Sequence, residues 1–452
     1  MRLPDLGLAW PGSPVRQRVP PAGLGFPLVD YPLALRQRGD RFLADFGPEA
    51  YASAALAGPT YHVDIATGND TNAGTSWGTA LKSIFVATQL GNTGGVPFNV
   101  RVKAGVYPRA NNFTNNGPMV VPTQPVAYRA VGGRVTCWAG HDLAWPATPH
   151  ATYGNCYAVA RSTVTVVLDL VAQNAFGDPL ELIRVADAAT CNATPGSWAQ
   201  ESGTLYVRRA DGAVPSSANT RVLIVVDAFA LDATGRSVFL EGFDFQGGAN
   251  GGVFVHGTAA RNVILVDCSA RYAGGPSHAG DGFRIEDSGG IAALVGCVAA
   301  ANASDGFDIR WSLGGTPSLR PLAIDCQGYG NGRHAHVSNN GFACHDSLSG
   351  IVVGGDFHDN CGANLRVAGA ARLWCLGTVA QASLGDAARG GTVPSIDFQA
   401  TGTAQLWLER ARSAVSTYAF AAADTAAIRL RQHAKGTGQA ELAPGGASIT
   451  AY

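Results

Sequence analysis

The chain has 452 residues, a formal net charge of −1 and 14% charged residues. This balance gives no electrostatic basis for binding nucleic acid or an anionic membrane surface. No apolar run of about 18 residues is present, so we expect no membrane span. The N-terminus lacks the charged and apolar regions of a secretory signal, and the 58 glycines favour a fold with many tight turns.

Residues 1–58 differ in composition from the rest of the chain. They contain eight of the 24 prolines and neither lysine nor cysteine. A stretch without sustained periodicity does not fold alone, yet this one carries many apolar residues, among them Trp10, Phe26 and Tyr31. We therefore expect an extended N-terminal anchor that orders against a partner protein or against other copies of the chain. The alternative is that residues 1–58 form a disordered tail.

Residues 59–110 have the pattern of a capped first coil. Tyr61–Asp64 alternates like a short strand, Trp77–Ala87 has apolar residues at helical spacing, and Val100–Val106 reads as a strand. A small helix here would cap an open β end, which would otherwise pair with other chains. The segment resembles the opening of right-handed parallel β-helix proteins of the pectate-lyase-like superfamily. That resemblance implies an all-β solenoid with a small capping helix.

Residues 111–237 are predicted to continue the β-helix with irregular insertions. The segment 137–157 is rich in Trp, Pro, His and Tyr and shows no strand period. Thr204–Arg209 and Arg221–Val226, in contrast, are strong strand runs.

Residues 238–452 are predicted to form regular coils. Three cysteines lie 29 residues apart, and each closes a similar tetrapeptide: Cys268, Cys297 and Cys326. A second recurring motif, Asp/Asn-Gly-Phe, begins at Asp281, Asp305 and Asn340. A fixed period of this size is the mark of a solenoid, and two strand phrases per turn predict a parallel β-helix. The thiols are expected to stack inside it as small hydrophobic groups.

Strand alternation around the second phrase separates an inner face from an outer face. Phe283 and Phe307 are expected to point inward, and the polar residues beside them outward. We predict a glycan-binding strip on the outside: Arg284, Glu286, Asp308, Arg310, Trp311 and His345. Because neighbouring strands lie about 4.8 Å apart, we expect Arg284 to pair with Asp308 and Glu286 with Arg310. The alternative is a surface ladder that only stabilises the sheet.

Asp281 and Asp305 are the candidate catalytic residues if the chain is an enzyme. They are expected to stack on adjacent coils, and a carboxylate pair about 5 Å apart suits a retaining glycosidase. Asp and Asn before Gly are also ordinary turn residues. A further file of Asp244, Asp267, Gly296 and Asp325 is a candidate cation site or second acid pair, and the alternative is the solvent face of the cysteine strand.

Four histidines fall close together in the sequence: His334, His336, His345 and His358. Their spacing matches no zinc signature, and the chain contains no nucleophile, phosphate-binding or dinucleotide-binding motif. We therefore predict no metal and no cofactor, and leave a His–Asp general-base pair as an open alternative.

The layout of the chain resembles phage or phage-like virion spikes, tail fibres and tailspikes, since an N-terminal anchor precedes a long solenoid. The resemblance implies a chain made in the host cytoplasm, held to a virion protein through residues 1–58, homotrimeric, and binding cell-surface polysaccharide. It is a likeness of architecture. The alternatives are a depolymerase on the same shaft (lyase, glycoside hydrolase or epimerase), a purely structural virion component and a bacterial surface protein.

Overall fold

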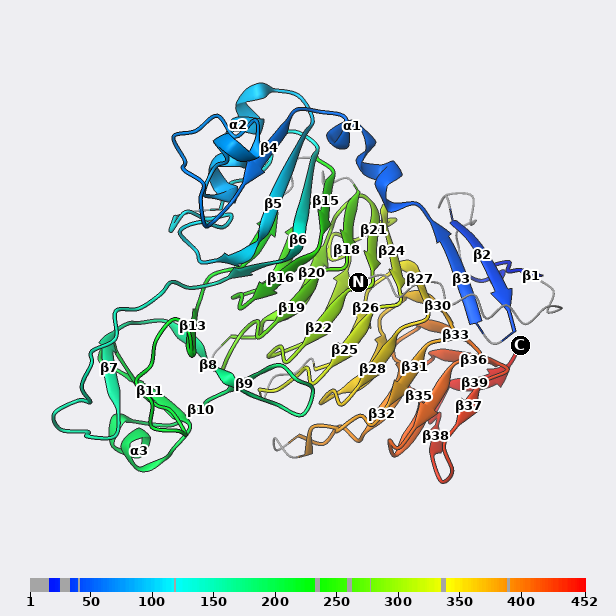
Figure 1. The fold of residues 1–452 in the computed structure, drawn as a ribbon. Coiled ribbons are helices and arrows are strands. Elements are labelled where there is room, and N and C mark those ends of the chain that lie inside the picture. The colour runs from blue at the N-terminus through cyan, green and yellow to red at the C-terminus, as the bar shows by residue number, and fades with distance from the viewer. Residues whose placement is uncertain are drawn as a thin grey trace.

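The computed structural model describes residues 16–24, 33–39, 41–117, 119–231, 236–257, 262–276, 278–334, 339–387 and 391–452. Strands wind into a long shaft, with the N-terminal cap at one end and the C-terminus at the other (Figure 1). None of the helices in these ranges is long and apolar enough to cross a membrane.

The shaft has three parallel sheets, because each regular coil contributes one strand to each sheet. The first sheet contains β4 (Thr60–Val63), β15 (Val238–Glu241), β18 (Val263–Val266), β21 (Gly290–Val295), β24 (Leu319–Ile324), β27 (Ser349–Val353), β30 (Arg372–Leu376), β33 (Gln405–Glu409), β36 (Ala427–Arg431) and β39 (Ser448–Ala451). The second contains β16 (Phe243–Gln246), β19 (Ser269–Arg271), β22 (Val298–Ala300), β25 (Gln327–Tyr329), β28 (Asp356–His358), β31 (Val379–Gln381), β34 (Arg412–Ala414) and β37 (Ala434–Lys435). Two long strands, β5 (Phe98–Tyr107) and β6 (Val126–Trp138), bend from the first sheet into the second.

The third sheet contains β14 (Phe229–Leu231), β17 (Gly251–His256), β20 (Asp281–Glu286), β23 (Phe307–Arg310), β26 (Phe342–Cys344), β29 (Ala363–Val367), β32 (Ile396–Ala400), β35 (Tyr418–Ala422) and β38 (Ala440–Leu442). In all three sheets a strand pairs in parallel with its counterpart one coil on. This arrangement confirms the predicted all-β parallel β-helix.

The corner between the first and second sheets is a single residue in the left-handed region. Asp267 has φ 53°, Gly296 62° and Asp325 50°. Asp and Gly tolerate this conformation better than most residues, which explains their alternation there. Asp244 pairs instead with Ser269, inside a strand. The predicted file of Asp244 with Asp267 and Asp325 is therefore wrong, since Asp244 lies past the corner.

The core of the shaft is built from repeated inward columns. The rings of Phe283 and Phe307 lie 5.1 Å apart and nearly parallel. The predicted thiol column is also present, and each thiol donates to a main-chain carbonyl of the preceding coil: Cys268 to Leu240, Cys297 to Leu265 and Cys326 to Leu294. The 29-residue phrases therefore mark buried positions, as predicted.

The N-terminal end is capped by α2 (Ile84–Gly94). Ser83 caps this helix by accepting from the Val86 N–H, and Gly95 ends it with φ 70°. The capping helix is confirmed, but it lies further along the chain than Trp77–Ala87, since Trp77–Thr79 forms a short 3₁₀ turn. Sequence periodicity missed the shift because the Ser83 cap, and not the first apolar residue, starts the helix.

The described part of residues 16–58, here called the strap, lies on the first sheet. It comprises β1 (Arg16–Gln17), β2 (Leu33–Arg38), β3 (Arg41–Phe46), the 3₁₀ turn η2 (Pro48–Ala52) and α1 (Ser53–Leu56). Its buried residues join one cluster with an outward apolar file of the first sheet: Phe239, Ile264, Ala293, Leu322, Ile351, Trp374 and Trp407. The expected anchor thus orders, in its described part, against the chain's own shaft, because that outer face is apolar.

Residues 139–228 leave the shaft as an insertion. Its strands are β7 (Tyr157–Ala160), β8 (Val164–Gln173), β9 (Pro179–Glu181), β10 (Ile183–Arg184), β11 (Ser197–Glu201), β12 (Thr204–Arg208) and β13 (Thr220–Ile224), with helix α3 (Ala188–Ala193). It projects to the lower left in Figure 1 and has a small core of its own around Trp198 and Leu205. The strands predicted at Thr204–Arg209 and Arg221–Val226 are confirmed as β12 and β13.

Candidate functional site

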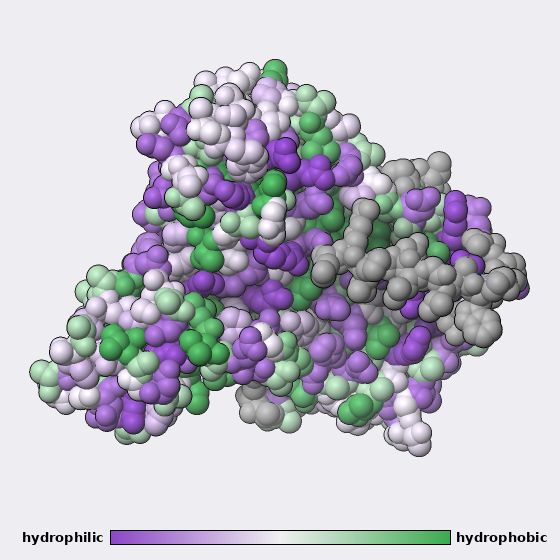
Figure 2. Space-filling model, viewed as in Figure 1, coloured by the Kyte–Doolittle hydropathy of each residue, from purple (hydrophilic) through white to green (hydrophobic). Residues whose placement is uncertain are grey.

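The three outer faces of the shaft have different surroundings. The first packs against the strap, and the second contacts the insertion through an ion pair between Arg271 and Asp178. The predicted strip lies on the third. On the side of the molecule seen in Figure 2, hydrophilic and hydrophobic residues are interspersed among the coloured atoms and form no single broad apolar surface.

The register of the third sheet agrees with the predicted strip. Arg284 lies opposite Asp308, and Glu286 opposite Arg310. One coil earlier, Phe254 lies opposite Arg284. Outward side chains therefore form two files across neighbouring strands, at the spacing that the sequence predicted.

The shortest ion pairs of the strip run along the strands, and one longer pair crosses between them. Arg284 donates from Nε and Nη2 to Glu286 Oε2, at 3.0 and 2.8 Å, whereas its nearest contact with Asp308 is 4.0 Å. Arg310 pairs with Asp308 of its own strand. The predicted Arg284–Asp308 pair is therefore present as the longer of the two Arg284 contacts, whereas the predicted Glu286–Arg310 pair is replaced by Arg284–Glu286 and Arg310–Asp308. Arg284 turns toward Glu286 because its guanidinium lies over the Phe254 ring, 5.4 Å from the centroid.

Two members of the predicted strip do not reach the surface. Trp311 is only 9% exposed and belongs to the main core cluster, and its indole N–H donates to the Gly314 carbonyl. Asp308 is 0% exposed. Arg284, Glu286, Arg310 and His345 remain partly exposed. The aromatic ring of the strip is that of Phe254, which lies opposite Arg284 one coil earlier.

Asp281 and Asp305 stack as predicted, but they form a turn ladder. Asp281 Oδ1 accepts from the Asp305 backbone N–H at 3.0 Å. Asp305 Oδ1 accepts in turn from the backbone and side-chain nitrogens of Asn340, at 2.6 and 2.9 Å. The two carboxyl groups are buried, with residue exposures of 3% and 0%. Burial, with the charges of Asp308 and Asp305, raises the pKa of Asp281 well above its usual value. This arrangement supports the turn-residue alternative over a catalytic pair, since both carboxyl groups are buried and accept hydrogen bonds from the next turn of the ladder.

One side-chain oxygen or nitrogen of each of Asp305, Asp308 and His345 lies within 4.8 Å of the others. A cation would fit these distances, but Asp308 already contacts Arg310 and lies near Arg284. The negative charge is therefore compensated by guanidinium groups. His345 Nε2 lies 3.5 Å from Asp308 Oδ1, and neither atom has a hydrogen bond within the described ranges.

The other histidines do not join this site. His334 Nε2 lies 3.6 Å from Glu181 of the insertion, and His358 Nδ1 lies 2.7 Å from Asp359. His336 falls outside the described residues. The proximity of these histidines in the sequence therefore does not become one cluster in space.

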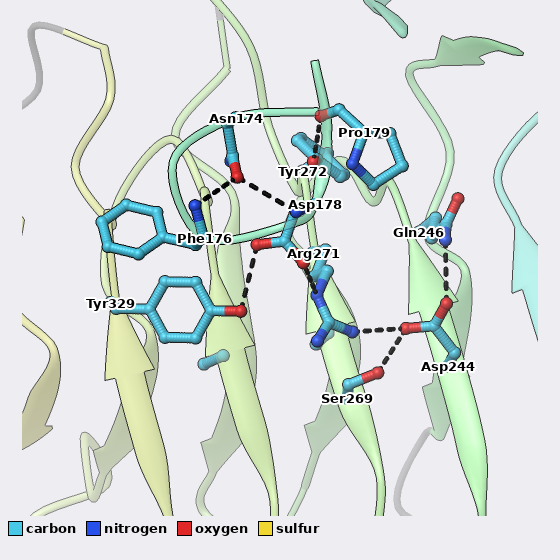
Figure 3. Close-up of polar contacts among 12 residues, drawn as sticks. Asn174, Phe176, Asp178, Pro179, Asp244, Gln246, Ser269, Arg271, Tyr272 and Tyr329 are labelled. Atoms are coloured by element: carbon cyan, nitrogen blue, oxygen red, sulfur yellow. Dashed lines mark hydrogen bonds and ion pairs between the residues drawn. The ribbon is translucent and has the colours of Figure 1, made fainter. Parts of the chain in front are cut away.

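A polar network joins the insertion to the second sheet (Figure 3). Arg271 donates from Nε to Asp178 Oδ1 at 3.0 Å and from Nη1 to Asp244 Oδ1 at 2.7 Å. The Tyr329 hydroxyl donates to Asp178 Oδ2 at 3.0 Å, and the Phe176 ring packs 4.9 Å from that of Tyr329. The sequence analysis missed this network, because alternation identifies outward residues on the shaft but not their partners in a distant loop.

No family model matches the chain, and no curated protein matches its sequence. Among solved structures, it is similar to a pectate lyase, with 13% identity over 88% of this chain and 80% of that one, at a TM-score of 0.40. It is also similar to the A-module of a mannuronan C-5 epimerase from Azotobacter vinelandii, with 13% identity, 81% and 94% coverage and a TM-score of 0.35. A Pseudomonas phage tailspike shows 12% identity, 88% and 80% coverage and a TM-score of 0.25. At these identities the likeness concerns the fold alone.

Proposed function

We propose that this parallel β-helix binds polysaccharide along the outer face of its third sheet, at Arg284, Glu286, Arg310 and His345. The observation that carries the proposal is the row of partly exposed donors and acceptors beside Phe254, repeated at strand spacing. Sugar hydroxyls accept from guanidinium groups and donate to carboxylates, and apolar sugar faces pack on rings. A row across successive strands suits a long polymer better than a small ligand.

The test is a binding assay with bacterial capsular polysaccharides and lipopolysaccharides on the immobilised chain. Arg284→Ala should weaken binding at least about tenfold, or about 1.4 kcal/mol, because it removes the guanidinium and its contact with Phe254. Arg412→Ala is the matched control, since Arg412 is exposed on the second sheet. Equal affinities for the two variants, or no binding to any polysaccharide by the unaltered chain, would contradict the proposal. The second result would favour a purely structural component.

A second candidate function is polysaccharide cleavage, which the Asp308–His345 contact favours. A buried carboxylate 3.5 Å from an imidazole can hold the ring in place for proton transfer. New reducing ends or unsaturated products in the same incubations would show cleavage. His345→Ala should then abolish product formation, while Arg284, Glu286 and Arg310 retain most of the polysaccharide binding. Unchanged product formation in that variant would exclude His345 as the proton-transfer residue.

We also propose that the chain is carried on a virion as a homotrimeric spike or fibre. This proposal rests on the sequence layout of an N-terminal strap followed by a long solenoid. Particles purified after host lysis should contain the chain in multiples of three copies, as measured by quantitative mass spectrometry. If the chain binds polysaccharide but is absent from such particles, the virion proposal is wrong and the binding proposal stands.

A further inference from the structure

Two cysteines of the insertion face each other away from the shaft. Cys156 lies in the loop before β7 and Cys191 lies in α3, 35 residues further on. Their sulfur atoms are 3.5 Å apart, and both residues are 0% exposed. They form a small buried cluster with Ala199, which is separate from the main core.

This pair differs from the thiol column of the shaft. There, each of Cys268, Cys297 and Cys326 donates to carbonyl oxygens of the main chain. In the insertion, the Cys191 sulfur also lies 3.6 Å from the Ser197 and Tyr206 carbonyl oxygens, but in addition the Cys156 thiol donates to it at 3.5 Å. That hydrogen bond lowers the pKa of Cys191 to about 7. A thiolate is the attacking form in disulfide exchange, so Cys191 is the better nucleophile of the two.

We propose that Cys156 and Cys191 are a modification site that closes to a disulfide on exposure to a small-molecule disulfide such as oxidised glutathione. The Cys191 thiolate attacks one sulfur of oxidised glutathione and releases one glutathione thiolate. Cys156 gives its proton to that thiolate and attacks the Cys191 sulfur of the mixed disulfide. The second glutathione leaves, so two protein thiols and one small disulfide become one protein disulfide and two small thiols.

Local opening of α3 gives the oxidant access to the buried pair. The helix has only six residues, and Ala189, Thr190 and Ala193 are exposed on it. Short elements with few buried residues open at low free-energy cost without unfolding the domain. Once formed, the disulfide ties α3 to the loop before β7 and restricts the same opening. The pair therefore links the flexibility of the insertion to the redox state around the chain.

The experiment treats the full, folded chain with oxidised glutathione, with dithiothreitol as the reduced reference. Remaining thiols are then alkylated in denaturant, and the chain is digested so that Cys137 and Cys156 fall on separate peptides. The expected product is one linked peptide pair containing Cys156 and Cys191, lighter by two hydrogens and absent after reduction. Cleavage within residues 186–196 by a protease should be at least several-fold slower in the oxidised chain.

Cys156→Ala and Cys297→Ala serve as matched variants, since each removes one buried thiol. Cys297→Ala should keep both the linked peptides and the protection from protease, and Cys156→Ala should lose both. Failure of the unaltered chain to form the linkage would overturn the proposal, and so would linkage of the shaft cysteines with equal yield. Both contradicting outcomes are measured on the unaltered chain, so a folding defect in a variant cannot hide them.

Discussion

At the scale of single residues, the burial of Asp281 has a consequence for stability against pH. Burial raises the pKa of this carboxyl above its usual 3.8. A raised folded-state pKa contributes stability below the unfolded pKa, and that contribution is lost as the pH rises through the folded value. Asp281→Asn keeps an oxygen for the Asp305 N–H and does not titrate. We expect the variant to gain stability relative to the unaltered chain between about pH 4 and about pH 7, as measured by urea unfolding.

Asp211 provides the opposite control. Its hydrogen bond from Arg209 lowers the pKa of the carboxyl, so its contribution is present above the unfolded pKa and is lost as the pH falls. Asp211→Asn should therefore lose stability relative to the unaltered chain as the pH rises toward the unfolded pKa of 3.8, and the difference should stay nearly constant at higher pH. A pH-independent difference for Asp281→Asn would show that the carboxyl ionises normally in the folded chain.

The residue scale also shows where sequence reasoning succeeded and where it stopped. Alternation placed Phe283 and Phe307 inside correctly, because a strand has a fixed period of two. The predicted strip included Trp311 against this period, which puts Trp311 on the inward side with Phe307 and Ile309, and it does lie in the core. The closer contact of Arg284 with Glu286 than with Asp308 was out of reach, since a long side chain selects its partner through local packing, here against Phe254.

At the scale of elements, the strap is expected to stabilise the shaft through its apolar side chains. Leu35 in β2 is 0% exposed within the cluster on the first sheet, so Leu35→Ala should lower the free energy of unfolding by about 2–5 kcal/mol. Leu43 in the adjacent strand β3 is 50% exposed, and Leu43→Ala should change it by less than about 0.5 kcal/mol. Equal effects in thermal or urea unfolding would mean that the strap does not dock as described.

The insertion should dock less firmly when its polar network is cut. Asp178→Asn removes the charge that accepts from Arg271 and Tyr329, at a cost of about 1–3 kcal/mol to that contact. Cleavage of the loop 174–181 by a protease should become faster while the shaft stays intact. Asp142→Asn, at an exposed position of the same insertion, is the control and should cleave at the original rate. An unchanged rate for Asp178→Asn would assign the docking to the packing of Phe176 and to the contacts of Pro179 and Glu181 with the shaft.

The surface under the strap had a sequence signal that alternation did not use. In β18 (Val263–Val266), apolar residues occupy consecutive positions, which indicates a strand buried on both faces. The repeated apolar runs in the first sheet therefore predict that its outer face is covered by another part of the protein. The repeats do not predict which segment covers that face, because the strap is far away in sequence and has no period of its own. The fold was predictable from repeats, whereas the docking of the non-repeating strap and insertion was not.

At the scale of the whole molecule, the strap decides whether the shaft exposes a continuous apolar surface. The file from Phe239 to Trp407 crosses seven successive coils and is buried under the strap. Large apolar patches on a folded surface drive association. A chain starting at residue 59 should therefore bind a hydrophobic dye and gain mass by self-association in analytical ultracentrifugation, whereas the full chain should do so far less. The prediction is wrong if the shortened chain binds no dye and has the same assembly state as the full chain. The outer face of the first sheet would then stay buried without the strap.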